Sequence, residues 1–289
     1  MDPGTWLEFL EIPEMQRALF VAALAGPACA LLGTFITLRG LAFFSDAIAH
    51  SALTALAIGF LFNLATDAHA PAMQALLAGF CVLLAVLMEW ARERTGLRPD
   101  TVLALAFTGS IALGVVLISR LRGYRVLESA LFGDILACTW LDIALVAVLA
   151  ITVFAVVGLN LRAFALSTVN EHLARLEGIP VRRLNYVFVV LVALVVALLL
   201  RQIGAMLISG LLVIPAAAAR FVAPSFRAML RLAVGFGLVG ALLGLFASYH
   251  LDTPTGPTMV LADLVLFGVA AAGAALAGRW RRRNGRPGA

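Results

Sequence analysis

Residues 39–62 read Arg39-Gly-Leu-Ala-Phe-Phe-Ser-Asp46-Ala-Ile-Ala-His50-Ser-Ala-Leu-Thr-Ala-Leu-Ala-Ile-Gly-Phe-Leu-Phe62, an apolar run that opens with an acid and a histidine. Asp46 and His50 lie four residues apart, so on a helix both side chains share one face. Ionisable groups inside a bilayer are costly and mark a functional site by default. A carboxylate oxygen with an imidazole nitrogen suits a divalent metal such as Zn²⁺ or Mn²⁺. The alternative is an intrahelical hydrogen bond that helps two helices pack.

The composition around this stretch is that of a membrane protein. Of 289 residues, 63% are hydrophobic and 13% are charged, and the mean hydropathy is +1.03. Soluble domains carry about 25% charged residues. We count nine candidate spans, at about 17–38, 43–64, 72–90, 101–119, 141–160, 185–200, 203–222, 230–249 and 259–279. The fold class is therefore an all-α polytopic membrane protein with eight or nine transmembrane helices, eight if two neighbouring spans form one hairpin.

Every basic residue is arginine, and the chain has no lysine. A phosphate-binding P-loop needs a lysine, so ATP hydrolysis by that route is not expected here. The arginines cluster in short loops, where they set orientation, and the net charge of +5 gives no argument for nucleic acid. With nine spans, the arginine groups at 92–98, 162–183, 220–231 and 279–286 share one side, predicted to be cytoplasmic together with the C-terminus. Arg120, Arg122 and Arg125 fall on the other side, against this rule.

No long linker divides the chain, so we predict one transmembrane domain over 17–280. An interfacial segment precedes it at 1–16, and a basic cytoplasmic tail follows at 281–289. The three cysteines, Cys29, Cys81 and Cys138, are isolated and are expected to be small buried residues.

The loop at about 167–183 is predicted to hold a short cytoplasmic helix. Ser167 or Thr168 is expected to cap this helix, Glu171 falls in its first turn, and Gly178 with Pro180 ends it. Such a helix is a docking surface for a partner protein, or else it lies on lipid headgroups.

Glycine and proline mark further features of the spans. Pro215 removes a backbone donor in mid-span and is expected to kink a helix, which suits either a moving pore-lining helix or static packing. Gly240 and Gly244 form a small-xxx-small pair for close helix approach.

Four further polar residues have open roles. Asp134 lies in an apolar segment too short to span, which suggests a re-entrant element, and Asp134 and Asp252 are expected to be helix caps rather than ligands. His250 is expected at the interface, and Asp263 lies inside the last span and needs a partner.

Taken together, these stretches resemble the permeases of ABC importers for zinc, manganese and iron, the ABC-3 metal permease family. The resemblance covers about Arg17 to Gly278. It rests on five segments in order: Gly33 to His50, Leu131-Phe-Gly-Asp-Ile-Leu136, Glu171-x-x-Ala174-x-x-x-Gly178-Ile179, Ile203-Gly204 to Pro215-Ala216, and Ser248 to Pro257. The chain departs from the family pattern at Thr54-Ala55, where relatives tend to have Pro-Gly, and at Asn170, where Asp is common.

The resemblance implies a homodimeric permease, separate cytoplasmic ATPase subunits and an extracytoplasmic metal-binding protein. It implies that Asp46 and His50 contact the metal in transit and that Glu171, Ala174, Gly178 and Ile179 belong to the segment received by the ATPase. Gly204 and Pro215 would serve gating or packing. A twofold dimer would join two Asp46–His50 pairs into a four-ligand site. No permanently bound cofactor is expected, and the choice among zinc, manganese and iron stays open.

Two other functions fit less well. A permease for an iron chelate or vitamin would not need a close Asp–His pair. A secondary transporter driven by an ion gradient is the other alternative, and uptake that survives ATP depletion but collapses with the gradient would favour it. An intramembrane enzyme has no support, since neither His-Glu-x-x-His nor Gly-x-Ser-x-Gly occurs.

Overall fold

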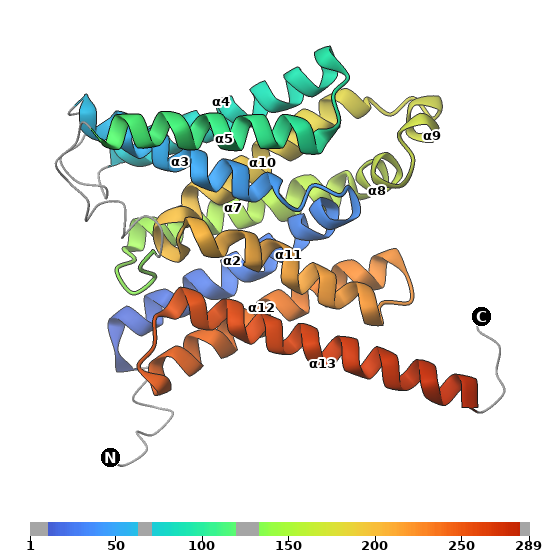
Figure 1. The fold of residues 1–289 in the computed structure, drawn as a ribbon. Coiled ribbons are helices and arrows are strands. Elements are labelled where there is room, and N and C mark those ends of the chain that lie inside the picture. The colour runs from blue at the N-terminus through green and yellow to red at the C-terminus, as the bar shows by residue number, and fades with distance from the viewer. Residues whose placement is uncertain (1–10, 63–70, 120–132, 284–289) are drawn as a thin grey trace.

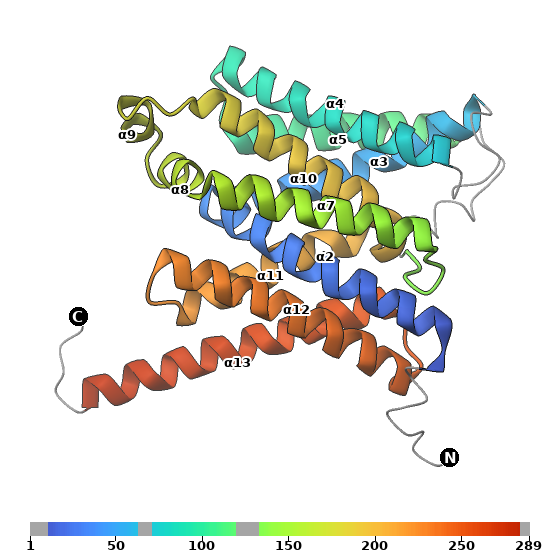
Figure 2. The same ribbon diagram turned by 180° about the vertical axis from the view of Figure 1, so that it is seen from behind.

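The described part of the chain, residues 11–62, 71–119 and 133–283 of a computed structural model, is helical and without strands. Its elements are α2 (Pro13–Leu38), α3 (Phe44–Leu61), α4 (Pro71–Thr95), α5 (Pro99–Ile118), α7 (Trp140–Leu159), α8 (Leu161–Val169), α9 (Glu171–Leu176), α10 (Val181–Ile203), α11 (Ala205–Val222), α12 (Phe226–Leu251) and α13 (Thr255–Arg283). The long helices lie side by side along one direction (Figures 1 and 2). Backbone groups have no water to bond inside lipid, so apolar segments satisfy them internally as helices.

Eight of these helices are long and apolar enough to cross a membrane. Helix α11 is the ninth predicted span, but its apolar part, Leu207–Val222, is shorter than the others. Helices α10 and α11 are separated only by Gly204, whose φ of 93° places it where side chains are strained. The prediction of eight or nine spans is therefore confirmed. The count is eight without the shorter helix α11 and nine with it.

Helix α2 is the centre of the bundle. It packs against α7, α11 and α12, and most of its apolar stretch is buried. Its glycines permit close backbone contact: a Cβ on Gly33 would lie 1.6 Å from the carbonyl oxygen of Leu212, and one on Gly26 would lie 2.3 Å from that of Gly237. Small residues at helix crossings are the usual means of packing helices in lipid.

The predicted Gly240–Gly244 pair packs in the same way, against α13. A Cβ on Gly244 would lie 2.3 Å from the Cα of Met259, and one on Gly240 would meet the Asp263 carboxylate at 1.7 Å. The small-xxx-small interpretation is thus confirmed.

One end of the molecule holds α8, α9 and the C-terminal end of α13 (right in Figure 1), and we name it the α8–α9 end. The described arginine clusters all belong to loops or helix ends on this side. The predicted exception, Arg120, Arg122 and Arg125, lies outside the described residues. Helix α13 runs on to Arg283, so the predicted tail from 281 begins as helix.

The opposite end is fastened by a buried ion pair. Arg201 in the last turn of α10 pairs with Asp142 in the first turn of α7. The same carboxylate accepts a hydrogen bond from Gln74 of α4 at 3.1 Å. Removing one partner of a buried ion pair leaves the other charge buried without compensation, which is strongly destabilising. This contact therefore holds α4, α7 and α10 together.

Candidate functional site

Asp46 and His50 share one face of α3, as their spacing predicts. Asp46 Oδ1 accepts a hydrogen bond from Ser209 Oγ of α11 at 2.5 Å. The Nδ1 atom of His50 lies 3.0 Å from the carbonyl oxygen of Asp46. A carbonyl oxygen can only accept, so Nδ1 carries the proton and the Nε2 lone pair is left for a ligand. The intrahelical Asp–His hydrogen bond named as the alternative does form, but it ends on the Asp46 backbone carbonyl, and the Asp46 carboxylate binds Ser209 of α11 instead.

Both residues line a cavity of about 560 Å³ between α3 and α5, which we name the ion cavity. The Phe107 ring lies edge-on to the His50 ring, with 5.1 Å between centroids. Phe43, also on the lining, is 71% exposed. Asp46 and His50 are themselves half-buried.

A single copy offers this cavity too few ligands for a closed metal site. Among the described residues, no group of three or more His, Cys, Asp and Glu side chains could hold a metal. Zn²⁺ usually takes four ligands. Asp46 and His50 therefore supply half of such a set.

The predicted coupling segment, about 167–183, contains the last residues of α8, all of α9 and the first residues of α10. The predicted cap is wrong: Asn170 caps α9, because its side-chain oxygen accepts from the Leu173 backbone N–H at 3.0 Å. Ser167 and Thr168 are engaged elsewhere. The predicted end is confirmed, since α9 stops at Leu176 and Gly178 adopts a φ of 75°.

Helix α9 is anchored on its inner side, and its outer side carries both leucines and polar residues such as His172 and Arg175. Ala174 is fully buried, while Leu173 and Leu176 are exposed, the latter by 85%. Glu171 accepts hydrogen bonds from Arg175 at 3.4 Å and from Asn185 of α10 at 3.5 Å. Ile179 closes the turn, its N–H donating to the Ala174 carbonyl at 3.0 Å.

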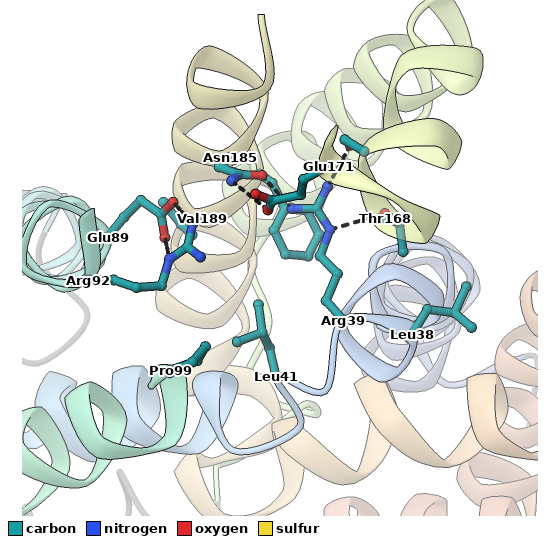
Figure 3. Close-up of a pocket in the computed structure, with 12 residues that line it drawn as sticks. Leu38, Arg39, Leu41, Glu89, Arg92, Pro99, Thr168, Glu171, Asn185 and Val189 are labelled. Atoms are coloured by element: carbon teal, nitrogen blue, oxygen red, sulfur yellow. Dashed lines mark hydrogen bonds and ion pairs between the residues drawn. The ribbon is translucent and has the colours of Figure 1, made fainter. Parts of the chain in front are cut away.

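Arg39 joins three elements through contacts that sequence reasoning missed. Its Nε donates to Thr168 Oγ1 at 3.1 Å, Nη2 donates to Ser167 Oγ at 3.1 Å, and Nη1 donates to Asn185 Oδ1 at 2.9 Å (Figure 3). The guanidinium also lies 4.6 Å from the Phe188 ring centroid. Burial lowers the pKa of Arg39 to about 10, which leaves it charged at neutral pH. The available signal was a lone arginine between two apolar runs.

The remaining predicted residues lie away from the ion cavity. Asp134 is no helix cap: its side chain accepts from the Leu136 N–H at 3.0 Å in a turn, and the re-entrant prediction lies partly outside the described residues. Asp252 is the C-cap of α12 with a φ of 51°, and His250 lies exposed against the Phe246 ring. Asp263 is buried, and within the described chain neither carboxylate oxygen has a hydrogen-bond partner.

Two predicted features of the spans are also located. Pro215 lies inside α11, and the kink it was expected to cause stays a prediction. Thr54-Ala55 leaves α3 continuous to Leu61, and the Thr54 hydroxyl donates to the Ser110 carbonyl of α5 at 2.6 Å. The three cysteines are free and buried, as expected.

Known proteins similar to this chain are membrane proteins of transport systems. A family model described as the ABC 3 transport family matches residues 11–274. The chain is 31% identical over 264 residues to the manganese transport system membrane protein MntC of Halalkalibacterium halodurans, covering 91% of this chain and 88% of that protein. It is 32% identical over 258 residues to the high-affinity zinc uptake system membrane protein ZnuB of Haemophilus influenzae, covering 88% and 96%.

A solved structure, that of PsaBC from Streptococcus pneumoniae in complex with Fab, is similar over 91% of this chain and 93% of its own. The TM-score is 0.78 and the identity is 27%.

Proposed function

The chain belongs to the ABC 3 transport family, and on that premise we propose that Asp46 and His50 contact a divalent transition-metal ion as it crosses this permease. The protein is a multi-pass membrane permease of a metal-transporting ABC importer, as its relatives are. The single observation that carries the proposal is the ion cavity, where Asp46 and His50 present oxygen and nitrogen donors within a bundle of apolar helices.

The two donors are held ready for an ion. Ser209 occupies one oxygen of Asp46, which fixes the carboxylate and leaves Oδ2 free. The Asp46 carbonyl fixes the His50 ring through Nδ1, which leaves Nε2 free. Outer contacts of this kind orient ligands and strengthen metal binding. Manganese, zinc and iron all accept such a donor set.

Two copies would complete the site. The incomplete donor set favours a second copy packed over the ion cavity, bringing two Asp46–His50 pairs together. The motor lies on other chains in this proposal, as the absence of lysine suggests. The exposed face of α9 is the surface for the ATPase, which makes the α8–α9 end cytoplasmic. A binding protein outside the membrane would deliver the ion.

Transport assays test the ion site. The permease, reconstituted with its ATPase subunits and binding protein, should take up radioactive Mn²⁺ or Zn²⁺ in an ATP-dependent way. Asp46→Ala combined with His50→Ala should reduce uptake to background at normal expression. His250→Ala, a histidine far from the ion cavity, should leave uptake unchanged. Full uptake by the double variant would refute the proposal.

A further inference from the structure

The segment that joins α2 to α3, residues 39–43, separates two cavities. Leu38, Arg39 and Leu41 line a cavity of about 210 Å³ against α8 and α10, which we name the coupling cavity. Gly40, Ala42 and Phe43 line the ion cavity. Neighbouring residues of segment 39–43 thus line different cavities. A displacement of this segment at the coupling cavity would also change the lining of the ion cavity.

The backbone of this segment is stiff. The Arg39 N–H donates to Phe35 at 3.0 Å, the Leu41 N–H donates to Ile36 at 2.9 Å, and the Phe44 N–H donates to Leu41 at 2.9 Å. Gly40 has a φ of 68°, which permits the tight reversal. Asp46 follows in the first turn of α3, so the segment and the ion ligand move as one unit.

Arg39 ties this unit to α8 and α10. Its three donors reach Ser167 and Thr168 at the end of α8 and Asn185 in the first turns of α10. Asn185 in turn donates to Glu171 at the start of α9. Within the described chain no carboxylate lies within ion-pair distance of Arg39, and its three hydrogen bonds go to neutral oxygens, while Glu171 and Glu89 act on its charge from farther away. Neutral acceptors can be exchanged without leaving a second buried charge unpaired.

The first part of α8 is also packed against the bundle through an aromatic contact. Phe164 of α8 packs against Phe35 of α2, with ring centroids 5.6 Å apart, and both rings are fully buried. The last turn of α8 carries Ser167 and Thr168, beside the exposed α9. A displacement of α9 would therefore be passed to Arg39 through its hydrogen bonds to Ser167, Thr168 and Asn185.

We propose that Arg39 is the positioning residue that links the α8–α9 segment to Asp46 and His50, so that ATPase movements reset the ion ligands. This inference rests on the function proposed above. Arg39 does not touch the ion. It sets where the 39–43 wall lies between the coupling cavity and the ion cavity.

The test measures transported ions per ATP hydrolysed in proteoliposomes that contain the complete importer and Mn²⁺. Arg39→Gln should lower Mn²⁺ uptake about tenfold while ATP hydrolysis stays near the wild-type rate. Arg39→Lys should not restore the number of ions transported per ATP. A single ammonium group cannot reproduce the planar guanidinium, which donates to three separate oxygens. Arg231→Gln is the matched control: this exposed arginine lies at the same end, near the start of α12 and outside the 167–183 segment, and should leave the ratio unchanged.

Equal falls in uptake and hydrolysis for Arg39→Gln, or the same loss in Arg231→Gln, would overturn the inference. Should Arg39→Gln fail to assemble, Ser167→Ala with Thr168→Val removes two acceptors and must give the same low ratio; an unchanged ratio overturns it too. Asp46→Ala runs in parallel. If Asp46→Ala abolishes uptake while the Arg39 variants keep the ratio, only the coupling role fails. If Asp46→Ala transports normally, the ion site itself fails.

Discussion

Replacing Gly33 by alanine tests the close approach of α2 and α11. An ideal Cβ at this position would lie 1.6 Å from the Leu212 carbonyl oxygen and 2.6 Å from its carbon. Both are backbone atoms, so no side-chain rotation relieves the overlap. Either the two helices would have to separate by roughly an ångström or more, or the backbone of α11 at Leu212 would have to distort.

The expected loss of stability follows from two opposing effects. Over-packing costs about 1–3 kcal/mol, and a backbone-to-backbone clash belongs at the upper end. Alanine is the better helix former by up to about 1 kcal/mol. The net destabilisation is therefore about 2 kcal/mol, which for a chain of this size lowers the melting temperature by about 5 °C.

The assay is thermal unfolding of the purified protein in detergent, followed by size-exclusion chromatography. Gly235→Ala serves as the matched control, because a Cβ there would meet nothing within 4 Å. The control should be unchanged or slightly stabilised. Metal uptake should fall as well in Gly33→Ala, since Ser209 lies one turn before Leu212 and moves with it. If Gly33→Ala unfolds at the same temperature as the control, the close crossing of α2 and α11 is refuted.

Three further predictions concern single side chains. Ser209→Ala should weaken Mn²⁺ binding about tenfold with the fold intact, because Asp46 loses its orienting donor; unchanged affinity in a titration would contradict this. Asp263→Asn should keep or raise the melting temperature, since the amide avoids a buried carboxylate without a partner, whereas Asp263→Glu should lower it by crowding Gly240; a marked fall for the amide would count against this account. Burial raises the pKa of the Cys138 thiol to about 12, so maleimide at neutral pH should label this position only after unfolding; rapid labelling of the native protein would show that the thiol is exposed.

The sequence determined the elements of this protein. Apolar runs must become helices in lipid, and polar residues, proline or glycine lie near most of their ends, so the predicted spans match the helices to within a few residues. The common face of Asp46 and His50 follows from the helical period alone. The end of α9 at Gly178 follows from local backbone chemistry.

Only the tertiary structure decided which side chains meet. Ser209 reaches Asp46 across 163 positions and Arg39 reaches Asn185 across 146, and nothing in hydropathy says which helices are neighbours. The capping prediction failed because Ser167 and Thr168 lie inside α8, where their side chains bind Arg39, and Asn170 is the residue that precedes α9. In lipid every helix face is apolar, so partner choice depends on small-residue crossings and a few polar contacts. These contacts become visible only when the helices are placed together.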